Sequence, residues 1–344
     1  MAAVYRRTAG SRPLSLTDML LFQLAAIAAL SWNAQVSNTT ASLRGLCVVS
    51  PKVVWASGTK GTFMRTTDGG EHWQSGSVAG AEALDFRDVE AFDADNAYLL
   101  ASGEGASSRV YKTTDAGAHW ELLFANPDAK GFFDDLSFWD AKHAVLLGDP
   151  VNGQFTIFTT ADAGKTWQRQ RAPAALEDEG AFAASGTSLV TKGKKQAWFA
   201  TGGPGGARVF QTQDGGKTWR VYTTPLGGAK TAGIFSLAFA DRKHGIAAGG
   251  DYKNDKAAEH TVAVTGDGGK TWQAATGLGY RSGLTALGKG TFVSVGTTGS
   301  DVSRDGGATW NHFSDMNLNA VASSAGQVWA VGPKGVVVKL AHKR

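Results

Sequence analysis

The sequence predicts an all-β protein, a seven-bladed β-propeller built from four-stranded antiparallel blades. Three observations support this prediction. The motif Ser/Thr-x-Asp-x-Gly-x-x-Trp occurs six times, first at Thr66–Trp73 and last at Ser303–Trp310, and its aspartates recur every 38 to 53 residues. The sequence between the copies is strand-like. The chain also holds 45 glycines against 8 prolines, which suits many short strands joined by tight turns. A repeat of this length that carries four strands is typical of a propeller blade.

Each interval between motifs contains four strand-like pieces. In one blade these pieces are residues 233–241, 244–250, 260–264 and 271–274, where apolar side chains alternate between turn residues. We denote such strands a to d, and the motif then forms the hairpin turn between strands c and d. The first six blades are expected to begin near Leu43, Phe86, Phe132, Gly180, Gly233 and Arg281.

The seventh blade is predicted to combine both ends of the chain. Residues 318–323, 328–331 and 336–340 supply three strands after the last motif, and no seventh motif follows them. Trp32–Val36 resembles a strand d with its tryptophan. Pairing these segments closes the ring and removes the exposed sheet edges that favour aggregation.

Residues 1–31 are predicted to be a signal peptide, and residues 32–344 the propeller. Arg6, Arg7 and Arg12 precede an apolar run over residues 19–30, and Ala29-Leu30-Ser31 offers small residues at the spacing that a signal peptidase reads. The run is short for a membrane span. We therefore expect a periplasmic or secreted protein without a stable membrane span after processing. A leader retained as an anchor is the alternative.

The charge balance argues against a nucleic-acid partner. The formal net charge is +4, and residues 32–344 carry 31 basic and 29 acidic residues. Cys47 is the only cysteine, so an internal disulfide and a cysteine zinc site are excluded. Its apolar neighbours predict a buried structural thiol.

The six motif aspartates are predicted to be structural. A carboxylate oxygen can accept backbone N–H groups of its own turn, and the second glycine can adopt positive φ. Each turn offers one regularly placed carboxylate, whereas a hard cation needs six or more oxygens. We therefore expect neither a metal nor a cofactor. The aspartates concerned are Asp68, Asp115, Asp162, Asp214, Asp267 and Asp305.

The motif resembles the Asp-box, or bacterial neuraminidase repeat. Residues 239–249 and 138–148, with their Phe-x-Asp-x-Lys-His core, resemble the photosystem II stability and assembly-factor-like family of bacterial propellers. The resemblance covers residues 32–340. It implies an extracytoplasmic scaffold or assembly role and not a reaction, although the sequence leaves the enzyme question open. We expect the protein to be a monomer.

A binding site is expected on the face formed by the d–a connections and the b–c turns. These connections carry charged residues that do not repeat from blade to blade, Asp85 and Arg87 among them, and non-repeating polar residues on a repeating frame are where function is usually placed. The partner would be a protein or a small ligand, carbohydrate or anionic. The candidate binding residues are Arg44, Arg109, Arg208, Arg281, Asp149, Asp251 and Tyr252.

The alternative is a sialidase-like glycoside hydrolase. In such a site the four arginines would converge on a carboxylate, Tyr280 or Tyr252 would be the nucleophile, Glu179 or Glu104 its partner, and Asp134 the acid/base. The Phe-Arg-Ile-Pro sequence of sialidases is missing, and Phe86-Arg87-Asp88-Val89 shares only its first two residues. The sequence therefore favours binding over hydrolysis.

Overall fold

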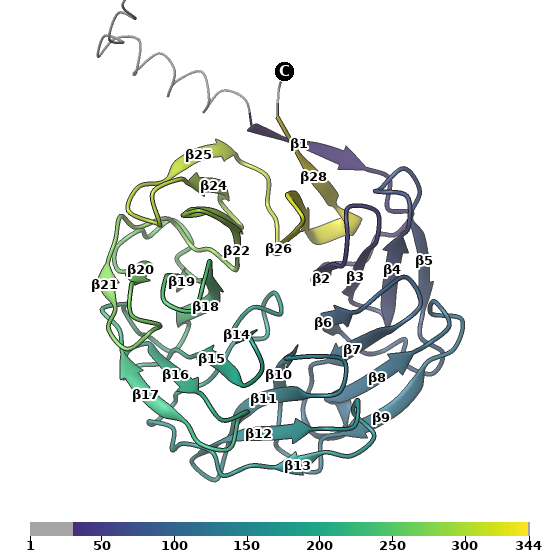
Figure 1. Cartoon of the computed structure of the whole chain (residues 1–344), viewed down its shortest axis with the longest axis horizontal. Coiled ribbons are helices and arrows are strands. Elements are labelled where there is room, and N and C mark those ends of the chain that lie inside the picture. Colours follow the sequence, from purple (N-terminus) through teal and green to yellow (C-terminus); the bar gives the residue numbers. More distant parts are fainter. Residues whose placement is uncertain (1–29, 343–344) are drawn as a thin grey trace, which may run out of the picture.

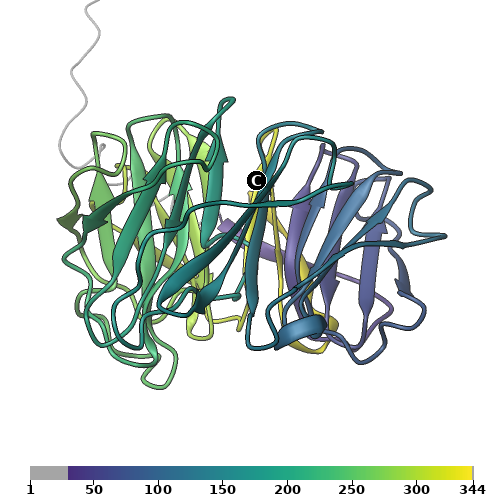
Figure 2. The ribbon, with the colours of Figure 1, turned by 90° about the horizontal axis from the view of Figure 1, so that it is seen from below.

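The computed structural model describes residues 30–342, which form a ring of seven four-stranded antiparallel sheets (Figure 1). The innermost strand of each sheet faces the central axis, and seen from the side the sheets stand next to one another around it (Figure 2). The predicted fold is confirmed. No helix among the described residues is long and apolar enough to cross a membrane.

The blades are numbered in chain order. Blade 1 holds β2 (Leu43–Val48), β3 (Val54–Gly58), β4 (Thr62–Thr66) and β5 (Gln74–Ser77). Blade 2 holds β6 (Phe86–Ala91), β7 (Ala97–Ala101), β8 (Arg109–Thr113) and β9 (Glu121–Ala125), with a short 3-10 helix, η1 (Gly105–Ser107), in its b–c turn. Blade 3 holds β10 (Phe133–Phe138), β11 (Ala144–Val151), β12 (Gln154–Thr160) and β13 (Gln168–Arg169).

The remaining blades follow the same order. Blade 4 holds β14 (Leu189–Lys192), β15 (Gln196–Ala200), β16 (Arg208–Thr212) and β17 (Arg220–Thr223). Blade 5 holds β18 (Ala232–Phe239), β19 (Gly245–Asp251), β20 (Val262–Thr265) and β21 (Gln273–Ala274). Blade 6 holds β22 (Gly283–Gly288), β23 (Thr291–Gly296), β24 (Gly299–Ser303) and β25 (Asn311–Ser314).

Blade 7 joins the two ends of the chain, as predicted. It holds β26 (Ala320–Ser324), β27 (Gln327–Val331) and β28 (Val337–His342), with η2 (Pro333–Gly335) between the last two, and β1 (Leu30–Gln35) is its outer strand. β1 runs antiparallel to β28, with Trp32 opposite Leu340 (Figure 1). β1 begins two residues before the predicted start of the propeller at Trp32. The rest of the predicted leader lies outside the described residues.

The first strand of blade 4 begins later than predicted. The sequence places its start near Gly180, but β14 begins at Leu189. Gly180 instead forms an isolated antiparallel bridge with Gly202, which in turn bridges Gly233 of blade 5. The segment between Gly180 and Leu189 is thereby free to cover the centre of the ring.

The hydrophobic core lies between neighbouring blades. Trp73 of the first motif packs with Leu43 and Met64 of blade 1 against Trp329 of blade 7, and the Trp73 and Trp329 rings meet edge to face at 5.6 Å. Buried aromatic pairs of this kind add about 0.5–1.5 kcal/mol beyond their area. Cys47 is partly buried, its thiol donates to the carbonyl oxygen of Ala91, and burial raises its pKa.

Each Asp-box turn is held by its own side chains. In the first turn, the backbone N–H of His72 and the hydroxyl of Thr66 donate to Asp68 Oδ1 at 3.0 and 2.8 Å. The Thr66 hydroxyl oxygen accepts the N–H of Gly70, whose φ is +96°. The same hydroxyl–carboxylate pair occurs in all six turns. The aspartates are therefore turn residues, as predicted.

Candidate functional site

A hollow of about 460 Å³ lies where the inner strands and their connections meet at the centre of the ring, and we call it the central hollow. All seven blades contribute to its lining, on the face formed by the d–a connections and the b–c turns. Its charged residues are Arg44, Arg87, Asp134 and Asp149, its aromatic residues are Phe132, Phe182, Phe235, Tyr252 and Tyr280, and Ser282, Thr297 and Asn319 supply further polar groups.

The lining is divided by chemistry around the ring. Blades 1 and 2 supply the two arginines, and blade 3 supplies the two aspartates. The aromatic side chains of Phe182, Phe235 and Tyr280 come from the blade 4 segment, blade 5 and the start of blade 6. A bound group would therefore meet cations on one side and rings on the other.

Arg44 is the arginine of the central hollow that has no counter-ion. Among residues 30–342 its guanidinium forms no ion pair and no side-chain hydrogen bond, although Asp85 lies near enough to favour its charged form. Burial and the neighbouring Arg87 both lower the pKa of Arg44. An arginine remains charged in proteins, so this site holds a partly desolvated cation without a partner.

Arg87, in contrast, is already occupied. Its Nε donates to Asp85 Oδ2 at 2.8 Å, and its Nη1 donates to the carbonyl oxygen of Ala183 at 3.3 Å. The segment that contains Ala183 is also held by Asp149, whose Oδ1 accepts the N–H of Ala181 at 3.0 Å. These bonds explain how the residues before β14 are fixed over the centre of the ring.

The two aspartates of the central hollow are protonated more readily than ordinary ones. Burial, together with the charges of Asp149 and Asp135, raises the pKa of Asp134. Burial raises the pKa of Asp149 to about 6, against the Ala181 hydrogen bond that lowers it. Asp134 is 2% exposed, and its Oδ2 has no hydrogen-bond partner among the described residues. Protonation of Asp134 and, below about pH 6, of Asp149 therefore reduces the negative charge that faces the arginines.

The aromatic side is rigidly packed. The rings of Phe182 and Phe235 stack at 3.9 Å, and Tyr280 meets Phe235 edge to face at 4.8 Å. Tyr252 stands at the edge of this cluster and is 47% exposed. Burial raises the pKa of the Tyr280 hydroxyl even though Arg44 lowers it, so Tyr280 is a neutral phenol and not a ready nucleophile.

The four candidate arginines do not meet at one point. Arg208 is paired with Glu179, Arg281 with Asp301, and Arg109 donates to the carbonyl oxygen of Ala106 and to the Tyr111 hydroxyl. None of these three lines the central hollow, and only Arg44 of the four does. Arg208 and Arg281 are neutralised by acids of their own blades, and Arg109 is held by uncharged groups of blade 2.

The central hollow holds only part of the residues of the hydrolase alternative, because neither Glu179 nor Glu104 lines it. The Glu179 carboxylate accepts hydrogen bonds from Arg208, from the Thr201 hydroxyl and from the N–H of Leu176. Glu179 is not part of the lining of the central hollow. Tyr280, Tyr252 and Asp134 do line it. Asp251 is held by Thr231 and by the N–H of Lys253.

The sequence places Arg87 on this face but does not reveal its ion pair with Asp85. It also gives no sign that residues 181–184 line the central hollow. Arg87 differs from Arg44 in having a carboxylate partner, Asp85, which lies two residues earlier in the chain, just before β6. The 181–184 segment carries small and apolar residues that are typical of the start of an ordinary strand.

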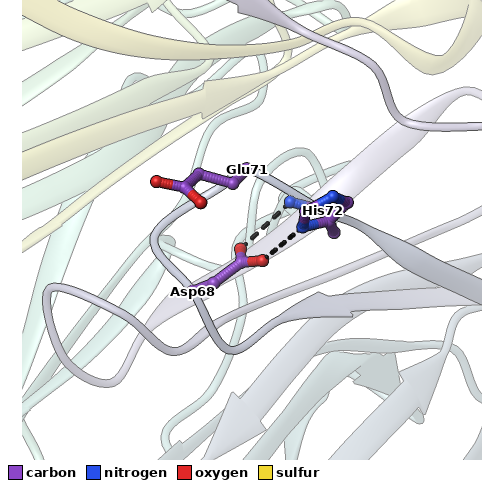
Figure 3. Close-up of side chains that lie close together, drawn as sticks. All are labelled: Asp68, Glu71 and His72. Atoms are coloured by element: carbon purple, nitrogen blue, oxygen red, sulfur yellow. Dashed lines mark hydrogen bonds and ion pairs between the residues drawn. The ribbon is translucent and has the colours of Figure 1, made fainter.

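Three side chains of the first Asp-box turn also lie close together. Asp68, Glu71 and His72 could offer ligand atoms within 4.8 Å of one another (Figure 3). The Asp68 oxygens are, however, already bonded to Thr66 and to the backbone and ring of His72, whose Nδ1 lies 2.7 Å from Asp68 Oδ2. His119 and Asp115 repeat the same pair in the second turn. We assign the cluster to the turn.

Comparison with known proteins agrees with the predicted resemblance. Residues 24–131 match the model of the family described as photosynthesis system II assembly factor YCF48. A search of the curated proteins finds no match.

Among solved structures, YCF48 bound to a D1 peptide is 17% identical, with a TM-score of 0.66 over 92% of this chain and 98% of that one. YCF48 from Cyanidioschyzon merolae is 17% identical, with a TM-score of 0.63 over 90% and 99%. The WD40 propeller domain of Doa1 is 13% identical, with a TM-score of 0.62 over 91% and 97%. The chain is thus a propeller of the YCF48 type in fold, as its sequence predicted.

Proposed function

We propose that this YCF48-like propeller is an assembly-factor-type binding protein, and that it holds a segment of a partner protein over the central hollow. The anchor would be an anionic group of that segment, which pairs with Arg44. Apolar side chains of the segment would pack on the aromatic side of the hollow.

The observation that carries the proposal is the unpaired guanidinium of Arg44. A partly buried charge without a counter-ion is costly in a folded protein, and it is usually retained where a ligand neutralises it. The other three candidate arginines have counter-ions or carbonyl partners of their own. Arg44 therefore differs from Arg208 and Arg281 in having a charge that no carboxylate neutralises, and from Arg109 in lining the central hollow.

The division of the lining supports a peptide more than a compact ion. Phe182, Phe235 and Tyr280 offer a preformed apolar surface beside the cation, and large rigid rings are typical anchors of protein interfaces. One of the similar solved structures, YCF48 bound to a D1 peptide, is a peptide complex of a propeller of this shape.

We also propose that the protein acts outside the cytoplasm, in the periplasm or after secretion. This proposal rests on the leader-like sequence of residues 1–31, with its arginines and apolar run. A single partly buried thiol and no second cysteine are compatible with an oxidising compartment, because no disulfide partner is available within the chain.

The test is a selection of random displayed peptides against the purified propeller, followed by measurement of the best binder by fluorescence anisotropy. Arg44→Glu should weaken that binding at least about tenfold, since it replaces the anchoring charge with a repelling one. Arg220→Glu is the matched control, because Arg220 is an exposed arginine on the outer strand β17. Its affinity should stay within about twofold of the wild type, as is usual for charges outside an interface.

Selected peptides that bind the Arg44→Glu protein as tightly as the wild type would contradict the proposal. The hydrolase alternative receives no support from the geometry, because Glu179 is held by Arg208 and does not reach the central hollow.

A further inference from the structure

The face opposite the central hollow carries a second concave surface, which we call the basic groove. It is a hollow of about 570 Å³ between blades 4 and 5, next to their Asp-box turns. Its cations are Lys192, Lys194 and Lys195 from the β14–β15 turn, Arg242 and Lys243 from the β18–β19 turn, and Lys270 from the β20–β21 turn.

The charge of the basic groove is strongly one-sided. Six of the chain's 34 basic residues line it, but only one of its 30 acidic residues does, Asp267. That carboxylate is used by its own turn, where it accepts the Thr265 and Thr271 hydroxyls and the N–H of Thr271. The concentration is local, because the rest of the chain is nearly balanced in charge.

The cations of the basic groove are available. Within residues 30–342 none of the six is paired with a carboxylate, and the side chains of Lys194, Lys195, Arg242, Lys243 and Lys270 are exposed. Lys192 is half-buried, and its Nζ donates to the carbonyl oxygen of Phe239 at 3.0 Å. Like charges held this close repel one another unless an anion lies between them.

The floor of the basic groove is made of amides. Gln196, Gln211 and Gln213 line it, and Gln211 is fixed by a 2.7 Å hydrogen bond from its Nε2 to the carbonyl oxygen of Gly268. Gln211 is buried, and its Oε1 accepts a hydrogen bond from Gln213 Nε2 at 3.3 Å. Gln196, which is half-buried, can both donate to and accept from a peptide backbone. At Lys194 and Lys195 the groove adjoins a neighbouring hollow of about 880 Å³ between blades 3 and 4, whose lining includes Asp140, Asp162 and Asp214. An acidic segment would therefore be confined to the basic groove itself.

We infer that the basic groove is a second interaction surface, which binds an acidic segment of a protein. The positive charge of the basic groove favours an anionic partner. Its concave shape and its lining then distinguish an acidic protein segment from a membrane or a nucleic acid. A flat membrane cannot reach the amide floor of a hollow. Among the described residues, those that line the groove include no aromatic ring on which a nucleic-acid base could stack. This inference is independent of the proposed function, because the two surfaces lie on opposite faces of the ring.

The test uses the full propeller and a short labelled peptide of alternating glutamate and serine, measured by fluorescence anisotropy. We expect saturable binding that weakens as salt rises from about 50 to about 200 mM, and no binding of the matching glutamine–serine peptide. The variant Lys194→Glu/Lys195→Glu should weaken binding at least about tenfold. The same variant should keep its affinity for the peptide selected against the propeller, which separates the basic groove from the central hollow.

The matched control is Lys130→Glu/Lys256→Glu, which reverses the same number of exposed lysines on connections of the other face. Circular dichroism and thermal melting of each variant establish that it is folded. An equal loss of binding in this control, or no loss in the groove variant, would overturn the inference. So would a single-stranded oligonucleotide or anionic phosphatidylserine vesicles that bind where the acidic peptide does not.

Discussion

Two adjacent glycines of the first Asp-box turn, Gly69 and Gly70, both have positive φ but differ in their surroundings. A Cβ on Gly70 would overlap the indole of Trp329 and come within 2.8 Å of the Gln35 amide oxygen. A Cβ on Gly69 would lie 3.2 Å from the carbonyl oxygen of Pro51 and 3.9 Å from Lys339 Nζ, without overlap. The position of Gly69 is alanine in two other turns, Ala116 and Ala163, both also at positive φ.

We therefore predict that Gly70→Ala destabilises the protein more than Gly69→Ala does. The left-handed conformation costs an alanine about 1 kcal/mol at either position, and the overlap with Trp329 adds about 1–3 kcal/mol at Gly70 alone. Urea denaturation of both variants measures the difference in the free energy of unfolding. Equal losses would show that the Trp329 contact does not constrain the turn.

The candidate site illustrates what single residues reveal before a structure is known. Their positions in the blades predicted that Arg44, Tyr280, Asp134 and Asp149 share the face that holds the central hollow, because strand starts and b–c turns are readable from the repeat. Whether an arginine is free or paired was not readable. Arg281 and Asp301 lie 20 residues apart, and the antiparallel pairing of β22, β23 and β24 brings Arg281 Nε to 2.7 Å from Asp301 Oδ2.

At the scale of elements, the closure of the ring depends on one short strand. β1 covers the edge of β28, and its Trp32 donates to the Ser300 hydroxyl of blade 6 at 2.9 Å and packs on Phe313 at 5.6 Å. Leu30 is buried in the same cluster. The strand therefore joins blade 7 to blade 6 as well as completing its own sheet.

We predict that removal of residues 1–35 abolishes the single cooperative unfolding transition and causes self-association, because the free edge of β28 can pair with other chains. Removal of residues 1–29, which leaves β1 intact, is the control and should keep a cooperative transition. Size-exclusion chromatography and thermal melting distinguish the two. A monomeric, cooperatively folded 36–344 chain would contradict the assigned role of β1.

Closure was predictable because Trp32 stands where a motif tryptophan should, even without its aspartate. The start of blade 4 was not predictable from the sequence. Gly180 has the sequence of a strand start, but its backbone pairs with Gly202, and a bridge between two glycines leaves no side-chain pattern. The 181–184 segment, which forms part of the central hollow, was missed for that reason.

At the scale of the whole molecule, buried carboxyl groups surround the axis of the ring. Asp88 accepts the N–H groups of Val89 and Leu136, and Asp135 accepts the Ser188 hydroxyl and the N–H of Leu189. These bonds link the inner strands of blades 2, 3 and 4. Burial raises the pKa of Asp88, raises that of Asp135 to about 6, and raises that of Glu90 to about 8.

These shifts predict that the protein is less stable at pH 8 than at pH 5. A carboxyl group whose pKa is higher in the folded state binds more protons when folded, so its contribution is complete below about pH 4 and is lost as the pH rises through 6 to 8. Urea denaturation at several pH values measures the slope. Asp135→Asn should flatten it by up to about 1.4 kcal/mol per pH unit near pH 5. A stability that rises from pH 5 to pH 8 would contradict the assignment.

The aspartates of the Asp-box turns have the opposite effect on the stability of the protein, which falls when they are protonated at acid pH. Hydrogen bonds from the backbone and side chain of His119 lower the pKa of Asp115 to about 2, and those from the side chain and backbone of Thr166 do the same for Asp162. Their contribution is present above about pH 4 and is lost as the pH falls toward 2. The highest stability is therefore expected between about pH 4 and pH 6.

Binding of a partner segment at the central hollow is tested most directly by hydrogen–deuterium exchange with a selected peptide. We predict slower exchange, when the peptide is bound, in the 181–184 segment and around Arg44 and Arg281–Ser282, with no slowing in the Arg44→Glu protein. Slowed exchange that is confined to the outer strands or to the Asp-box turns, and that persists in Arg44→Glu, would contradict binding at the central hollow.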